Sequence, residues 1–161
     1  MDKIEELLKD PKTDLQKQAL TDKSYKKTPN NQDCKINFEL ATYGDAILKC
    51  VLCKIYFERE DEDNFGLKGK LTEWKKQYES DEVLVKFIAR HYDILNFLNF
   101  DRDDTKKPRG YDYQGKNAKR RYKYIATAME ASIAAVYLEN GENEVIEIVK
   151  QWIEWIDESK S

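Results

Sequence analysis

Glu130 is the only charged residue in a long apolar segment, YIATAMEASIAAVYL (124–138). A segment this apolar, if it is helical, is enclosed by other elements on most sides. A carboxylate placed there is destabilising unless it is paired with a cation, protonated or bound to a metal ion. Asp45 follows Gly44 within a second apolar segment, ATYGDAILKCVL (41–52). Two such acids predict one shared site for a divalent cation, since Mg²⁺ commonly takes one or two protein carboxylates and keeps several waters.

The simpler alternative for each acid is an ion pair with a neighbouring lysine or arginine. Lys49 lies four residues after Asp45, a spacing that brings two side chains together on a helix. Gly44 costs about 1 kcal/mol in a helix relative to alanine, and such a glycine often marks the close approach of another backbone. The alanines around Glu130 would permit that approach. From these residues alone, a metal site and a set of ion pairs both stay open.

The elements that would carry these acids are helices. Apolar residues recur at helical spacing through most of the chain, and the segment from about 36 to 57 is too long for a strand. With only 6 Gly and 3 Pro, a turn-rich β architecture is disfavoured. We therefore expect one all-α domain over residues 1–161. The expected helices lie near residues 4–8, 15–20, 36–57, 71–78, 83–92, 94–100, 122–138 and 142–156, with loops at 24–33 and 101–115 and an acidic linker at 58–63.

A basic cluster lies just before the apolar segment that carries Glu130. The chain as a whole has a net charge of −3, which argues against a globally basic nucleic-acid binder. Residues 106–123, however, hold eight basic side chains against one acid, Asp112. Such a local excess suits phosphate binding, although a solvated basic loop would look the same. The candidate RNA-binding residues are Lys106, Lys107, Arg109, Lys116, Asn117, Lys119, Arg120 and Arg121.

Several other classes of protein and site are disfavoured. No apolar run is long enough to cross a bilayer, so we expect no membrane association. Three cysteines do not suggest a disulfide framework, and a reduced, cytoplasmic location fits them best. Cys50 and Cys53 form a C-x-x-C pair within a helical segment, but only Cys34 and His91 remain as further zinc ligands. We expect neither a structural zinc site nor histidine-based catalysis.

Four segments together resemble the ribonuclease III family in order and spacing. NFELATYGDAIL (37–48) looks like the family's signature helix, and ATAMEASIAAVYLENG (126–141) resembles its second acidic motif. QALTDKSYKK (18–27) and GKLTEWKKQYESDEVL (69–84) are similar to the family's segments before and between these motifs. The resemblance implies a ribonuclease III endonuclease-type helical domain, and we expect no separate double-stranded-RNA-binding domain.

The chain departs from the family's acidic pattern at several positions. Asp45 and Glu130 match one acid of each motif, whereas Ala41 and Thr127 stand where the family has two further acids. Phe38 replaces another family acid, Asp22 replaces the family's histidine, and Lys68 lies near the remaining acidic position. This altered pattern resembles the Mini-ribonuclease III subgroup, as does QGKNAKR (114–120) before the second motif.

The resemblance implies hydrolysis of double-stranded RNA, leaving a 5′-phosphate, with Mg²⁺ or Mn²⁺ held by Asp45 and Glu130. The Thr127 hydroxyl could orient a metal-bound water, or the side chain could simply be packed. The family works as a homodimer through its signature helix, and the expected interface residues here are Tyr43, Ile47, Cys50 and Val51. The Mini subgroup suggests ribosomal RNA processing.

Two other functions remain open. The losses at Ala41 and Thr127 would also suit a ribonuclease III fold that binds RNA, or associates with ribosomes, without cleaving. A helical protein-interaction module without any RNA role is disfavoured by the basic cluster.

Overall fold

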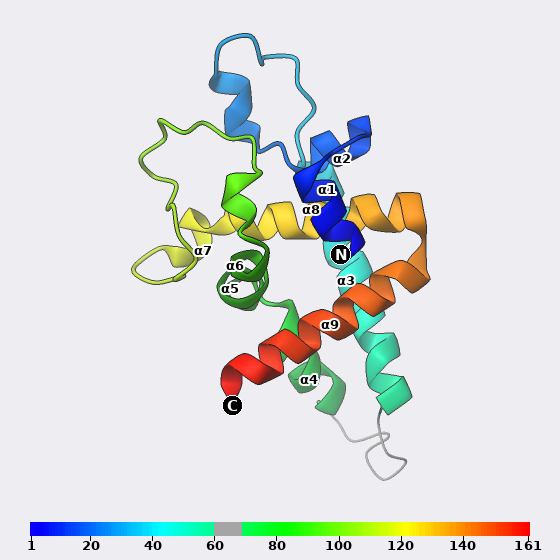
Figure 1. Ribbon diagram of the computed structural model, residues 1–161. Coiled ribbons are helices and arrows are strands. Elements are labelled where there is room, and N and C mark those ends of the chain that lie inside the picture. The colour runs from blue at the N-terminus through cyan, green and yellow to red at the C-terminus, as the bar shows by residue number, and fades with distance from the viewer. Residues whose placement is uncertain (60–68) are drawn as a thin grey trace.

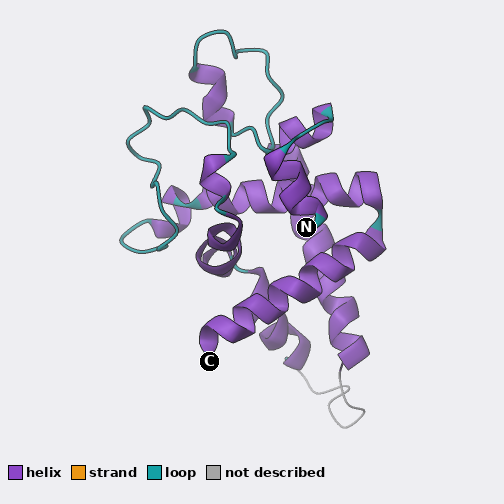
Figure 2. Ribbon diagram, in the orientation of Figure 1, coloured by secondary structure: helices purple, strands orange, loops and turns teal. Residues whose placement is uncertain are grey.

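The computed structural model describes residues 1–59 and 69–161, which form helices joined by loops (Figures 1 and 2). Within these ranges there is no strand, only an isolated bridge between Thr21 and Asn99, so the all-α prediction is confirmed. The predicted acidic linker from residue 60 onward and Lys68 lie outside the described residues. The elements in chain order are α1 (Lys3–Lys9), α2 (Asp14–Ala19), η1 (Lys23–Lys27), α3 (Phe38–Arg59), α4 (Lys70–Glu79), α5 (Asp81–Val83), η3 (Leu84–Ala89), α6 (Arg90–Tyr92), η4 (Ile94–Asn96), α7 (Ala118–Arg121), α8 (Lys123–Asn140) and α9 (Glu142–Lys160).

The long predicted helices are confirmed, and the differences lie in short segments. The predicted loop at 24–33 begins with the 3₁₀ helix η1, because the Asp22 side chain accepts a hydrogen bond from the Ser24 N–H and caps it. The segment 94–100 is helical only over η4. Its end pairs instead with the chain after α2, where the Asp22 N–H donates to the Asn99 carbonyl at 2.9 Å. The predicted helix over 83–92 includes a π-helical stretch, η3.

Helix α8 is the centre of the fold, and α3 packs along it more extensively than any other pair of described elements does. Nearly every residue of α8 from Tyr124 to Val136 is buried. The two backbones approach very closely at Gly44, where an added Cβ would lie 1.7 Å from the Glu130 carbonyl oxygen. The close approach expected of this glycine is therefore confirmed.

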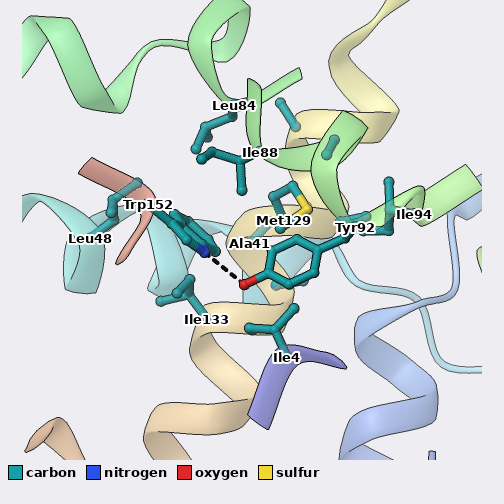
Figure 3. Close-up of a cluster of buried hydrophobic side chains, with 14 of the residues drawn as sticks. Ile4, Ala41, Leu48, Leu84, Ile88, Tyr92, Ile94, Met129, Ile133 and Trp152 are labelled. Carbon is teal, nitrogen blue, oxygen red and sulfur yellow. Dashed lines mark hydrogen bonds between the residues drawn. The ribbon is translucent and has the colours of Figure 1, made fainter. Parts of the chain in front are cut away.

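Helix α9 and the N-terminal helix α1 contribute to the same buried cluster, in which Ile4, Tyr92 and Trp152 lie together (Figure 3). Trp152 of α9 is buried, and its Nε1–H donates a hydrogen bond to the Tyr92 hydroxyl at 2.8 Å. The Tyr92 hydroxyl donates in turn to the Asp2 carboxylate at 2.7 Å. These bonds satisfy the polar ends of two large buried rings, so the 81–92 segment is held against α8 and α9. None of the described helices combines the length and apolarity needed to span a bilayer.

Candidate active site

A cleft of about 710 Å³ opens beside the crossing of α3 and α8. One wall comes from the first half of α3, another from the end of α4 and the start of α5, and the third from α7 and α8. Asp45 and Glu130 both line it, although the sequence separates them widely. The close packing at Gly44, one residue before Asp45, sets the two acids at the same level of the helix pair.

The two acids differ in exposure. The Glu130 residue is only 6% exposed, as its apolar helix predicted. The Asp45 side chain is 37% exposed, so the expectation that both acids are nearly buried is wrong for Asp45. Asp45 lies between the buried face and the exposed face of α3. The pair therefore consists of an inner carboxyl and an outer one.

This arrangement moves the two pKa values in opposite directions. Burial, together with the hydrogen bond to Asp45 and its negative charge, raises the pKa of Glu130 to about 8. Burial alone would raise the pKa of Asp45 as well, but hydrogen bonds from Lys49 and Glu130 outweigh it and lower that pKa. Near neutral pH the pair thus shares one proton, which resides on Glu130. A divalent cation would supply the charge that lets both groups ionise.

Lysines supply positive charge at the mouth of the cleft. The Lys49 Nζ lies 2.9 Å from the Asp45 carboxylate, so the ion-pair alternative for Asp45 is confirmed. Lys123 pairs with Asp81 at 3.1 Å, and its charge partly offsets the rise in the pKa of Glu130. Among the residues the structure describes, no lysine or arginine forms a direct ion pair with Glu130. The inner carboxyl therefore has no cation of its own.

Ala41 and Thr127, the positions where the resemblance led us to expect two further acids, also face this cleft. Thr127 is partly exposed rather than packed in the core. Its hydroxyl is thus placed beside the cleft, one helical turn before Glu130. Over residues 1–59 and 69–161 no group of three or more acids, histidines or cysteines is arranged to hold a metal ion. Asp45 and Glu130 are nevertheless close enough to share a hydrogen bond.

Three further acids line the cleft that the sequence pattern did not predict. Glu79, Asp81 and Glu82 lie where α4 ends and α5 begins, on either side of Ser80, which caps α5. The Glu79 side chain is 17% exposed and lies 3.6 Å from Lys75, while its buried Oε2 accepts no hydrogen bond. The only signal was the acidic run ESDE (79–82) at a helix boundary. Such a run is usually a solvated helix end.

The basic cluster divides into structural and exposed residues. Lys107 is 14% exposed, pairs with Asp22 at 3.2 Å and lies over the Tyr124 ring. Arg109 donates to the Arg102 carbonyl and lies over the Phe100 ring. The RNA-binding prediction is therefore wrong for Lys107, whose charge is already used to hold the loop. The predicted residues that are exposed on the loop and on α7 are Lys106, Arg109, Lys116, Asn117, Lys119, Arg120 and Arg121.

The predicted dimer residues also divide. Tyr43 and Cys50 are exposed on α3, whereas Ile47 and Val51 are buried in the monomer core. Ile47 and Val51 lie on the side of α3 that faces α8, so a partner could not reach them and the prediction for these two is wrong. An outer stripe of small and apolar side chains continues from Tyr43 through Ala46 and Cys50 to Phe57.

The fold is all-α, and a carboxylate-lined cleft lies where its two central helices cross. Comparison with known proteins shows which family has this fold. The family model described as ribonuclease-III-like matches residues 12–155, so the chain belongs to the ribonuclease-III-like family. It is similar to ribonuclease 3 of Azotobacter vinelandii, with 31% identity over 87% of this chain and 52% of that protein. Ribonuclease 3 of a Nitratiruptor species is 28% identical over 87% of this chain and 54% of its own length. The chain thus spans about half the length of these curated relatives.

The fold is also similar to a solved structure. The nuclease domain of ribonuclease III from Campylobacter jejuni superposes with a TM-score of 0.69 and 25% identity, covering 94% of both chains. That domain is described as structurally flexible in a region involved in dimer formation. A second structure of the same nuclease domain gives a TM-score of 0.67 at 23% identity and supports the fold.

Proposed function

We propose that this protein is a metal-dependent endoribonuclease that hydrolyses double-stranded RNA. The observation that carries the proposal is the convergence of Asp45 and Glu130 on one cleft, where burial raises the pKa of Glu130 and no lysine or arginine of residues 1–59 and 69–161 forms an ion pair with it. Two adjacent carboxyls that do not both ionise at neutral pH fit a divalent cation, whose charge would favour the ionised form of both. The resemblance to ribonuclease III supplies the reaction class.

Mg²⁺ or Mn²⁺ is the proposed cofactor, and Asp45 and Glu130 are its proposed ligands. When bound, such an ion lowers the pKa of a coordinated water and polarises a phosphoryl oxygen. Glu130 would release its proton to solvent when it bound such an ion, and the residue is only 6% exposed. Thr127 can hold a water that fills one of the positions left by the missing acids. With only two carboxylates, we expect weaker metal binding than a four-acid site would give.

The RNA would lie along α7 and the preceding loop, which carry the exposed cations of the basic cluster. Lys119 belongs to both the cleft and α7, so it connects the two regions. Contacts of this kind read the shape and phosphates of a duplex rather than its sequence. We therefore propose that this domain itself binds RNA, without requiring a separate RNA-binding domain.

Replacing Lys119, Arg120 and Arg121 together with alanine should weaken binding to duplex RNA and reduce its salt dependence. Removing one phosphate-binding cation lowers the magnitude of the slope of log K against log salt by about 0.7 to 0.9, so removing three should lower it by about 2 to 3. Fluorescence anisotropy across a salt series, in EDTA, measures this directly. The matched control replaces Lys3, Lys9 and Lys12, which line a different cavity. Equal slopes in both triple variants would contradict the proposed RNA surface.

A homodimer is the proposed assembly, and the outer stripe of α3 is its proposed interface. Tyr43, Cys50 and Phe57 are exposed there, and exposed apolar side chains that gather on one helix face commonly mark an interaction surface. The Campylobacter nuclease domain, described with a region for dimer formation, supports this choice. A two-fold dimer would bring two clefts to one duplex.

The oligomeric state is measured first, by light scattering on the wild-type protein, and we expect the mass of two chains. The same protein is then used to test cleavage. Incubation with duplex RNA and Mg²⁺ or Mn²⁺ should give products that carry a 5′-phosphate. Asp45→Asn and Glu130→Gln should each reduce the cleavage rate by at least about a hundredfold, because each removes a ligand of the cation. Glu139→Gln, which changes an exposed acid on the same helix as Glu130, should cleave like the wild type. Cleavage that survives both Asp45→Asn and Glu130→Gln would exclude this site, and a mass of one chain would exclude the dimer.

A second function is favoured by specific residues. Ala41 and Thr127 leave the cleft with two adjacent carboxylates, and Lys49 already neutralises the outer one. These features suit a protein that binds RNA without cleaving it. Duplex binding without metal-dependent cleavage by the wild type would establish that alternative. Similarity of the site to the Mini-ribonuclease III subgroup, a role in ribosomal RNA processing and a cytoplasmic location all stay predictions.

A further inference from the structure

Lys49 occupies an unusual position for a surface lysine. Its Nζ hydrogen-bonds to Asp45 at 2.9 Å, and it also lies close enough to Glu79 and Glu130 for each of these carboxylates, when ionised, to act on it. It is attached to α3 one turn after Asp45, so it reaches the outer carboxylate without disturbing the helix. The ammonium group thus lies among the carboxylates that a bound cation would also face.

The side chain is nevertheless able to move. Lys49 is 44% exposed on the cleft rim, and its long unbranched stem has several rotamers in reach. A half-exposed ion pair makes only a modest contribution to stability, so a divalent ion with twice the charge can replace the ammonium group although it must compete with it. Glu130 and Glu79 are much less exposed than Lys49, so their side chains have less room to turn towards solvent.

We infer that Lys49 is the internal counter-cation of the cleft, and that a divalent ion binds by displacing its ammonium group from Asp45. The inference rests on the metal site of the proposed function but not on cleavage. An ammonium group carries one charge and donates hydrogen bonds, whereas a divalent ion carries two charges and accepts oxygen ligands at shorter distances. Lys49 would therefore keep the metal-free cleft neutral and would lower its affinity for metal, making it a determinant of metal occupancy.

The test compares Mn²⁺ binding by the wild type and Lys49→Met, with free Mn²⁺ measured by electron paramagnetic resonance. Methionine keeps the length and apolar stem of the side chain but removes the competing charge, so we expect about tenfold tighter binding. Lys49→Arg keeps a cation and should bind Mn²⁺ like the wild type. Lys54→Met is the matched control, since Lys54 lies on the same helix but pairs with Glu142 outside the cleft, and its affinity should not change.

The outcomes separate this inference from the proposed function. Equal Mn²⁺ affinity of the wild type and Lys49→Met, or weaker binding by the variant, overturns the role of Lys49 even if the wild type cleaves RNA. Tighter binding by Lys49→Met supports it even if neither protein cleaves RNA, in which case only the proposed catalysis fails. Tighter binding by Lys54→Met to the same degree also overturns it, because the effect would then be general surface charge. If neither the wild type nor Lys49→Met binds Mn²⁺ at millimolar concentrations, the role of Lys49 and the proposed metal site are both overturned.

Discussion

Glu130→Gln is expected to stabilise the metal-free protein above pH 8 while leaving its stability near pH 4 almost unchanged. The pKa of Glu130 is about 8 in the folded protein, against 4.5 as its ordinary value. The native state therefore binds this proton more tightly than the unfolded chain, and wild-type stability falls as the pH rises from about 4.5 to about 8. Glutamine resembles the protonated acid and has no proton to lose. The variant should avoid that fall.

The expected gain at pH 9 is roughly 2 to 4 kcal/mol, since each pKa unit corresponds to 1.36 kcal/mol and water in the open cleft reduces the full effect. Urea denaturation in EDTA at pH 5, 7 and 9 measures it. Glu139→Gln changes an exposed acid of the same helix and should follow the wild type at each pH. If the free energy of unfolding of Glu130→Gln and of the wild type changed with pH in the same way, the pKa of Glu130 would not be raised in the folded protein. Adding Mn²⁺ at pH 9 should stabilise the wild type more than the variant, which lacks the second carboxylate.

The fold was largely predictable because its long helices carry strong local signals. The apolar stretch around Glu130 is uniform enough to require burial on nearly every side, and α8 is indeed the central helix. The short segments were less predictable because tertiary contacts decide them. The chain after Phe97 leaves η4 to hydrogen-bond with the segment that follows α2, and no local pattern encodes that pairing.

The pair Asp45 and Glu130 could be predicted from the sequence, but the residues around them could not. Asp45 and Glu130 stand out because each interrupts an apolar segment, and Gly44 explains how their helices can meet. Glu79 reaches the cleft only because α4 ends beside it, which depends on tertiary geometry. Lys107 resembles its basic neighbours in the sequence, but its buried partner Asp22 lies far away along the chain. Charge pattern cannot distinguish a phosphate ligand from such a structural cation.

Gly44→Ala is expected to destabilise the protein by at least about 3 kcal/mol, although alanine is the better helix former by about 1 kcal/mol. The added Cβ would lie 1.7 Å from the carbonyl oxygen and 2.5 Å from the carbonyl carbon of Glu130. Both are backbone atoms of the buried central helix, so no side-chain rotation can relieve the overlap. Helices α3 and α8 would have to separate, and their packing is the most extensive in the described fold.

Separation of these helices would also move Asp45 away from Glu130, so the same substitution should weaken Mn²⁺ binding in whatever fraction stays folded. Thermal and urea denaturation measure the stability loss, and electron paramagnetic resonance measures the bound Mn²⁺. Gly110→Ala is the matched control, because nothing lies within 4 Å of a Cβ at that position, and its stability should stay within about 0.5 kcal/mol of the wild type. A Gly44→Ala protein as stable as the wild type would mean that α3 and α8 are not in backbone contact there. The shared geometry of the two carboxyls would then lose its physical basis, since the tight crossing is what brings residues so distant in sequence to one cation.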